Sequence, residues 1–348
     1  MSTFKKWILL QCMLLSLCIT SSVYAQTHFG ERADVQVFIK TIAQQHGFNA
    51  RALTQLFNQV ELQPKIITSM TQPYEKQPWN VYKQLFLKPE RVQDGIDFWK
   101  KNQATLALAE KKYGVPAHII VSIIGVETRY GRYQGTYRVI DSLSTLAFTY
   151  PPRAAFFKKE LTEFLLLCRE QHTRPIDYLG SYAGAIGKPQ FMPSSYRYYA
   201  ADFEGRLNKD LMHDDQAVIA SVANYFQKHG WQDHQAIALP AAIKGEGYRR
   251  INTTYRVARY SVGELKQAGI KLNTGKIPTH QKAGLIQLQT QTGSEYWVTY
   301  PNFYVITRYN TSPQYALVVH LFAEQLQQQW QATAARSMSR AQRSLSLS

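Results

Sequence analysis

The sequence predicts a mainly α-helical protein with a small β insertion. In the N-terminal half, apolar residues recur every three or four positions, which is typical of helices with one buried face. Between residues 236 and 309 the pattern changes to alternation, as at Ile286, Leu288 and Thr290, which is typical of half-buried strands. An apolar content of 45% with 18% charged residues indicates that the 348-residue chain is globular.

The expected helices follow in order along the chain. An apolar stripe over residues 35–42 is closed by Gly47, and Asn49 can cap a second helix. A longer helix is expected over residues 89–113, ending at Gly114. Further helical patterns cover residues 152–172, 189–199, 217–229 and 314–330.

The C-terminal third contains the expected strands and a polar tail. Residues 296–300 and 303–307 are β-prone runs, interrupted by Gly293 and Pro301. From Ala332 onward Ser, Arg and Ala dominate, and we expect this tail to be disordered.

The first 25 residues have the pattern of a removable export signal. Lys5 and Lys6 precede an apolar run over residues 7–19, and Val23-Tyr24-Ala25 fits a signal peptidase site. The run is shorter than the roughly 18 residues that span a bilayer, and no later run is longer. We therefore expect a periplasmic protein and not an integral membrane protein.

The cysteines agree with export and exclude a disulfide scaffold. Cys12 and Cys18 leave with the signal, so Cys168 remains alone in an apolar run and is expected to be a buried thiol. An alternative makes Cys18 a lipid-modified N-terminus attached to the outer membrane, although Leu17 is large for the position before such a cysteine.

The charge indicates an anionic partner. The chain carries +16, which favours nucleic acid, acidic lipid or the carboxylate-bearing bacterial wall. Export disfavours nucleic acid. The 22 Tyr, 16 Phe and 6 Trp favour a carbohydrate, because aromatic planes stack on sugar rings. A cationic surface without a target remains an alternative.

One segment carries the candidate acid. Pro116 suits the first turn of a helix that is apolar almost all round, and Ile119, Ile120, Ile123 and Ile124 share the face of Glu127. A poorly hydrated carboxyl group favours its protonated form, which a general acid requires. The alternative is a structural glutamate paired with a neighbouring arginine, Arg129 or Arg132.

A glycine-rich segment over residues 180–196 is the second cluster. Three glycines in eight residues permit close approach to a ligand, and Pro189 is expected to start a helix with Gln190 on its first turn. The Gln190 amide offers a donor and an acceptor, as recognition of an acetamido sugar requires. A loop whose glycines only turn the chain is the alternative.

These residues resemble the lytic murein transglycosylase B family. The similar motifs are Gly125–Gly131, Ser181–Tyr196, Ser221–Tyr225 and two blocks within Pro301–Asn310, and the similarity extends over residues 35–331. It implies a lysozyme-like helical catalytic core at residues 113–235 and 301–331. It also implies an additional helical domain at 26–112 and a small β domain at 236–300.

The resemblance also implies a reaction. The MurNAc–GlcNAc β-1,4 bond of peptidoglycan is cleaved with formation of 1,6-anhydroMurNAc, and Glu127 acts first as acid and then as base. Most glycosidases need a second carboxylate. Asp141, Glu160 and Glu163 lie near Glu127 in the chain, so a partner carboxylate stays open at this point. A hydrolytic muramidase and a non-catalytic peptidoglycan-binding protein are the alternatives.

Substrate-binding residues carried over by the resemblance lie along most of the chain. They are Tyr82, Arg153, Ser181, Gln190, Tyr225, Tyr309, Asn310 and Tyr315. No cofactor is implied. We expect a monomer that acts on peptidoglycan glycan strands and binds no nucleic acid, with peripheral or lipid-anchored attachment to the outer membrane left open.

Two departures from the family pattern matter. Where the family commonly has Tyr-Pro-Arg-Arg, Pro152 replaces one arginine and only Arg153 remains. Relatives often carry an EF-hand-like calcium loop where this chain has residues 202–210. Here Arg206 stands at a ligand position, so we expect calcium binding to be lost. Asp202, Glu204 and Asn208 could still coordinate weakly, or Arg206 could pair with Asp202 in place of the ion.

Overall fold

A computed structural model describes residues 28–71, 76–254, 256–272 and 277–346, with side chains as far as Arg336. The expected export signal, Cys12 and Cys18 lie outside the described residues. The chain divides into two compact units, of which the first ends at Val60 and the second begins at Glu61. Each unit is described by itself.

The first unit is a small helical body whose ends follow the predicted caps. It contains η1 (Phe29–Glu31), α2 (Ala33–His46) and α3 (Ala50–Phe57). Gly47 adopts a left-handed conformation at the end of α2, and the Asn49 side chain accepts the Ala52 N–H at 2.9 Å. Both predicted helix ends are confirmed.

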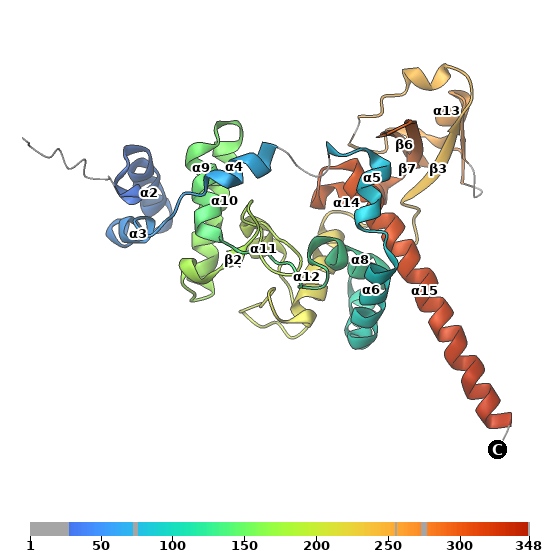
Figure 1. The fold of residues 1–348 in the computed structure, drawn as a ribbon, viewed down its shortest axis with the longest axis horizontal. Helices are drawn as coiled ribbons and strands as arrows, with labels where there is room; N and C mark the ends of the chain where they lie inside the picture. Colours follow the sequence, from blue (N-terminus) through green and yellow to red (C-terminus); the bar gives the residue numbers. More distant parts are fainter. Residues whose placement is uncertain (1–27, 72–75, 255, 273–276, 347–348) are drawn as a thin grey trace, which may run out of the picture. The chain divides into compact units, whose positions relative to one another are not determined.

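The second unit is built mainly from helices (Figure 1). Those before the insertion are α4 (Pro64–Thr71), α5 (Trp79–Tyr82), η3 (Lys83–Leu85), α6 (Pro89–Lys101), α7 (Gln103–Tyr113), α8 (Ala117–Thr128), α9 (Val139–Thr149), η4 (Pro151–Arg153), α10 (Ala154–Glu170), η5 (Pro175–Asp177), α11 (Pro193–Tyr199) and α12 (Asp215–Lys228). The remainder are η6 (Gly247–Arg250), α13 (Val262–Gln267), α14 (Pro301–Tyr309) and α15 (Pro313–Ser346).

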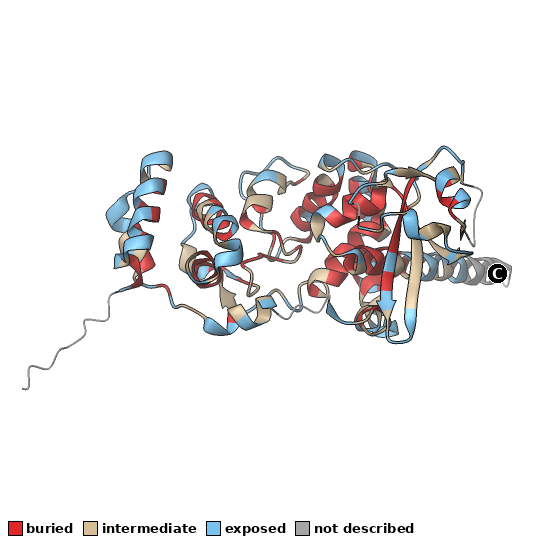
Figure 2. Ribbon diagram, turned by 90° about the horizontal axis from the view of Figure 1, so that it is seen from above, coloured by how far each residue is buried: buried red, intermediate tan, exposed pale blue. Residues whose placement is uncertain are grey.

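Helix α8 is the buried centre of the second unit, as predicted. Ile120, Ile123 and Ile124 are completely buried, and α8 packs against α6, α7, α12 and α15. The Ser122 hydroxyl donates to the Val319 carbonyl of α15 at 2.7 Å, which satisfies a buried polar group. Figure 2 shows buried residues concentrated on the helices of this unit.

Two predicted helix boundaries differ in the structure. The helix expected over residues 89–113 is interrupted at Asn102, whose buried amide donates to the Phe98 carbonyl at 3.0 Å. Such local hydrogen bonds compete with regular helix. The helix expected from Pro189 begins instead at Pro193. Ile186 and Phe191 pair as an antiparallel bridge, which places Pro189 and Gln190 in the tight turn between them.

Two segments are helical against expectation. Residues 303–307 were predicted as a β-prone run, but they lie in α14, where Pro301 takes the first position and burial overrides strand propensity. The tail predicted to be disordered from Ala332 continues α15 as far as Ser346. This stretch contains neither Gly nor Pro, so nothing in it ends the helix.

The predicted β insertion is a five-stranded antiparallel sheet in the order β4-β6-β7-β3-β5. Its strands are β3 (Ala238–Ile243), β4 (Tyr260–Ser261), β5 (Ile270–Leu272), β6 (Lys282–Thr290) and β7 (Gly293–Thr299). The insertion has its own core, which includes Val262, Leu265, Leu285 and Val298. A separate short pair joins β1 (Tyr137–Arg138) to β2 (Leu179–Gly180).

Candidate active site

Glu127 lies at the C-terminal end of α8, where the backbone turns sharply. Arg129 and Tyr130 both have positive φ, 49° and 61°, a conformation that is uncommon outside glycine. The Thr128 hydroxyl donates to the Lys188 carbonyl at 2.8 Å and accepts the Gly131 N–H at 2.9 Å. The first bond joins the end of the buried helix to the glycine-rich segment, and the second closes the turn that follows Glu127.

The Glu127 carboxylate accepts a hydrogen bond from the Tyr315 hydroxyl. Tyr315 is buried at the start of α15, and burial together with the negative charge of Glu127 raises its pKa well above 10. The same two causes raise the pKa of Tyr309. Both tyrosines therefore stay protonated at neutral pH. Arg129, one of the partners considered for Glu127, forms an ion pair with Asp94.

Two cavities meet at Glu127. One has a volume of 590 Å³ and the other 570 Å³, and Glu127, Tyr182 and Asn310 belong to the walls of both. Glu127 thus lies where the two cavities join. An extended chain that occupied both cavities would have one of its internal bonds next to the Glu127 carboxyl group.

All eight predicted substrate-binding residues lie in the walls of these cavities. Tyr82, Asn310 and Tyr315 belong to the 590 Å³ cavity. Arg153, Ser181, Gln190, Tyr225, Tyr309 and again Asn310 belong to the 570 Å³ cavity. What each contacts on a substrate stays a prediction.

The hydroxyl groups of two wall tyrosines are engaged within the protein. Tyr225 donates to the Arg308 carbonyl at 2.6 Å, and Tyr309 donates to the Pro189 carbonyl at 2.5 Å. Tyr225 is 6% exposed, and its ring stacks on His229 with 4.0 Å between centroids. These tyrosines line the cavity with their rings, and their hydroxyl groups bind backbone carbonyls of neighbouring segments.

Gln190 is positioned by the turn and not by a helix. Its φ is 50°, and its side-chain nitrogen donates to the carbonyls of Gln134, at 3.1 Å, and Gly187, at 3.0 Å. Both amide hydrogens are therefore used. Among the described residues its oxygen has no donor, so the Gln190 side chain offers an acceptor to a ligand, such as the N–H of an acetamido group.

The acids near Glu127 in sequence are bound to other groups. Asp141 pairs with Arg138, and Glu163 pairs with Arg197. Glu160 lies in the wall of the 570 Å³ cavity and accepts the Ser194 N–H at 2.9 Å and the Ser194 hydroxyl at 2.7 Å. Glu160 therefore caps α11.

Sequence reasoning missed several charged wall residues. Glu90 lines the 590 Å³ cavity from the first turn of α6, and no motif in the sequence marked it. Five cationic side chains also line the cavities, and of these only Arg153 was predicted to bind substrate. They are Lys88, Arg91 and Arg129 in one cavity and Arg153 and Arg308 in the other. Cations exceed acids in these walls, which suits a substrate that carries carboxylates.

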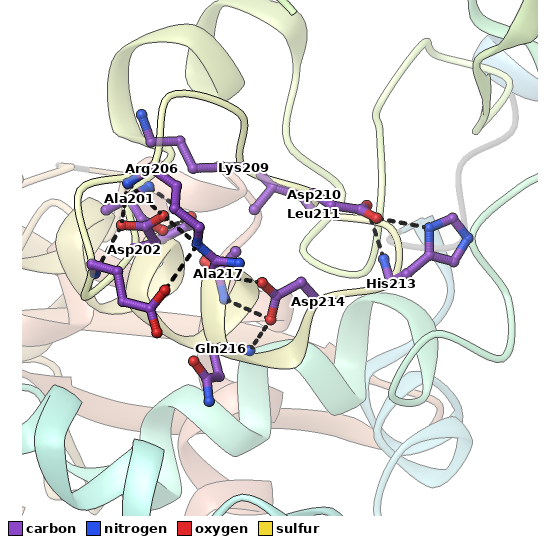
Figure 3. Close-up of polar contacts among 12 residues, drawn as sticks. Ala201, Asp202, Arg206, Lys209, Asp210, Leu211, His213, Asp214, Gln216 and Ala217 are labelled. Atoms are coloured by element: carbon purple, nitrogen blue, oxygen red, sulfur yellow. Dashed lines mark hydrogen bonds and ion pairs between the residues drawn. The ribbon is translucent and has the colours of Figure 1, made fainter.

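The loop expected to resemble a calcium site holds a guanidinium instead (Figure 3). Arg206 Nε lies 3.0 Å from Asp202 and 3.5 Å from Glu204, and its Nη2 lies 2.8 Å from Asp214. Of the two alternatives left open for this loop, the structure shows the pairing of Arg206 with Asp202. A bound cation would have to share these oxygens with a fixed positive charge, so the loop does not fit calcium.

Two further observations concern predictions made above. Cys168 is buried, as predicted, and burial raises the pKa of its thiol to about 12. Among the described residues, no helix combines the length and the apolar character that crossing a bilayer requires.

Comparisons with known proteins identify the family of this chain. Residues 30–324 match the family described as Transglycosylase SLT domain. The membrane-bound lytic murein transglycosylase B of Escherichia coli (strain K12) is 40% identical over 301 residues, which are 84% of this chain and 82% of that protein.

Solved structures of similar proteins share the fold. The lytic transglycosylase SltB1 from Pseudomonas aeruginosa is 44% identical with a TM-score of 0.81, over 87% of this chain and 99% of that chain. A more distant relative, SltB3 from the same organism, was solved in complex with NAG-anhNAM-pentapeptide. It is 27% identical with a TM-score of 0.73, over 84% of this chain and 79% of that chain. The chain therefore belongs to the lytic murein transglycosylases of the Transglycosylase SLT domain family.

Proposed function

We propose that this chain cleaves the MurNAc–GlcNAc β-1,4 bond of peptidoglycan and leaves a 1,6-anhydroMurNAc end, with Glu127 as the single acid and base. The observation that carries the proposal is the position of Glu127 at the junction of two cavities. The names of the relatives support it, since SltB1 and the E. coli relative are named lytic transglycosylases and SltB3 was solved with NAG-anhNAM-pentapeptide.

The reaction needs one proton to move out and one to return. Glu127 gives its proton to the glycosidic oxygen as the bond from C1 to that oxygen breaks. The resulting carboxylate takes the proton of the muramoyl C6 hydroxyl while O6 forms a bond to C1. No water is consumed, so no second carboxylate has to activate one. The Tyr315 hydroxyl, which donates to Glu127, orients the carboxylate in the base step.

The other wall residues then have separate tasks. The Gln190 oxygen would accept the N–H of an N-acetyl group, and the rings of Tyr225 and Tyr309 would form an apolar surface for a sugar face. The wall cations other than Arg129, which is paired with Asp94, would face the lactyl and peptide carboxylates of the substrate.

The deciding experiment is digestion of purified sacculi by the wild type and by Glu127→Gln, with product masses as the readout. We expect anhydro products from the wild type and none from the variant. Products heavier by one water would establish a hydrolytic muramidase. Equal binding to murein by both proteins, with no cleavage by either, would establish a non-catalytic binding protein.

We also propose a periplasmic location and a monomeric state. The E. coli relative is named membrane-bound, which supports an envelope enzyme. Cell fractionation with labelling by palmitate separates a cleaved signal from a lipid anchor at Cys18, since only the anchor incorporates the label. Light scattering of the purified protein measures its mass in solution.

A further inference from the structure

The β6–β7 hairpin contacts a short segment, residues 77–86, that includes α5 and η3. This segment forms one wall of the 590 Å³ cavity. In this hairpin Leu288 pairs with Glu295 and Thr290 with Gly293, so the turn lies between Thr290 and Gly293. Helix α5 lies beside β6 (Figure 1). The insertion, whose core is its own, therefore contacts a wall of the active site through the end of this hairpin.

Glu295 on β7 binds two residues of that segment. One carboxylate oxygen accepts the Trp79 indole N–H at 2.7 Å, and the other lies 2.9 Å from the Lys83 ammonium. Trp79 is completely buried, so its indole N–H depends on this acceptor. The Lys83 ammonium also lies 5.4 Å from the centre of the Trp79 ring, where a cation is attracted by the ring face.

The turn of the hairpin adds a second attachment. The Asn80 amide donates to the Gln291 side-chain oxygen at 2.7 Å, and the Asn80 oxygen accepts the Gln291 backbone N–H at 3.0 Å. Three of the five residues from Trp79 to Lys83 are thus bonded to β7 or to the turn. The paired geometry fixes the rotation of α5 as well as its position.

The same segment carries groups into the cavity. Tyr82, Leu85 and Phe86 line it together with Glu127 and Tyr315. The Tyr82 ring packs on Phe86 with 5.3 Å between centroids. Gln314, the neighbour of Tyr315, donates to the Gln77 carbonyl at 3.1 Å, so the start of this segment is also tied to α15.

We propose that Glu295 is a positioning residue, which holds Tyr82 against the Glu127–Tyr315 pair through Trp79 and Lys83 and thereby sets the affinity of the 590 Å³ cavity for the glycan. The β insertion then acts as a brace for the catalytic groove. This proposal rests on the proposed function, because it presupposes that the cavity binds the glycan strand.

The test measures binding separately from chemistry. In the Glu127→Gln background, titration of soluble glycan strands gives Kd for Glu295→Ala and for the matched control Glu246→Ala, which removes an exposed carboxylate from the same insertion. We expect Glu295→Ala to weaken binding by about tenfold, and Glu246→Ala to remain within about twofold. In the enzyme that keeps Glu127, Glu295→Ala should mainly raise KM, and the product should still be the anhydro sugar.

A double-mutant cycle distinguishes positioning from general stabilisation. If Glu295 acts through Tyr82, Glu295→Ala should lose its effect on Kd in a Tyr82→Leu background, because the ring that it positions is gone. An equal loss in both backgrounds, or a Kd unchanged by Glu295→Ala, overturns the proposal. If Glu295→Ala does not fold, Glu295→Gln and Lys83→Met are measured in its place, and unchanged Kd values for both overturn it as well.

Failure of the proposed function gives a different result. If the wild type releases no anhydro product, the proposed function is wrong, whatever the effect of Glu295→Ala on binding. If the wild type does release it and Glu295→Ala binds normally, only the positioning role is wrong.

Discussion

The Tyr315 hydroxyl donates a hydrogen bond to Glu127, although the two residues are 188 positions apart in the chain. Helix α8 supplies the acid and α15 supplies the donor, and the Ser122–Val319 hydrogen bond joins the same two helices in the core. The pair is therefore held from both sides by buried backbone. A proton donor that cannot ionise at neutral pH suits a carboxyl group that must alternate between acid and carboxylate.

Tyr315→Phe should therefore lower kcat without unfolding the protein. A hydrogen bond to a charged group contributes about 1.5–3 kcal/mol, so we expect kcat to fall by about 10- to 100-fold. The matched control is Tyr304→Phe, which removes a buried hydroxyl that bonds to Thr299 and lies outside the cavity walls. Turnover of soluble strands by Tyr315→Phe at the wild-type rate would contradict the role given to this hydroxyl.

The remaining wall acids should be dispensable for the reaction. Glu160→Gln weakens the cap of α11 and is expected to cost about 1–2 kcal/mol of stability, measured by urea unfolding. Both Glu160→Gln and Glu90→Gln should still release anhydro products at no less than about a tenth of the wild-type rate. Complete loss of cleavage in either variant, with the fold intact, would instead indicate a mechanism with two carboxylates.

The sequence singled out Glu127, which the structure places in the walls of both cavities, because a single helix carries the signal. The apolar residues around α8 predicted burial, and burial of α8 is what places Glu127 beside the core. The glycine-rich segment drew attention to Gln190, but the prediction that Gln190 lies on the first turn of a helix was wrong. Pro189 and Pro193 both suit the start of a helix, and only the Ile186–Phe191 bridge decides between them.

Contacts between distant segments were out of reach of sequence reasoning. Trp79 and Glu295 are 216 positions apart, and neither lies in a motif that predicts the other. Glu90 reaches the cavity because α6 packs on α8, which no local pattern encodes. The strand predicted for residues 303–307 was wrong for a related reason, because their burial in α14 outweighs their strand propensity.

Calcium should not stabilise this protein, because Arg206 already supplies a positive charge to the loop. Thermal unfolding of the wild type is expected to be the same with millimolar Ca²⁺ and with a chelator. Arg206→Ala should lower Tm by a few degrees, since Asp202 and Asp214 lose a shared partner. Lys209→Ala, which removes a charge from the same loop, is the control. A rise in the Tm of the wild type on addition of calcium would show that the loop still binds it.

Acid should destabilise the protein through two histidines, His320, which is buried, and His118, which is half-buried. Burial lowers the pKa of His320 to about 4, and burial together with His320 lowers the pKa of His118 to about 4. An unfolded histidine titrates near 6.5. Between these values the unfolded chain binds protons that the folded chain excludes, so stability is complete above pH 6.5 and falls as the pH drops towards 4.

The variant His320→Gln isolates this effect, because glutamine can still donate to the Ala238 carbonyl that His320 contacts at 3.0 Å. The stability lost between pH 7 and pH 4.5, about 2–3 kcal/mol for this group, should shrink in the variant. Glu324, 3.5 Å from His320, has its pKa raised by burial, so its contribution runs in the opposite direction and remains in both proteins. The exposed His213→Gln serves as the control. If urea titrations show that His320→Gln loses as much stability between pH 7 and pH 4.5 as the wild type, the histidine is protonated in the folded state and does not limit stability in acid.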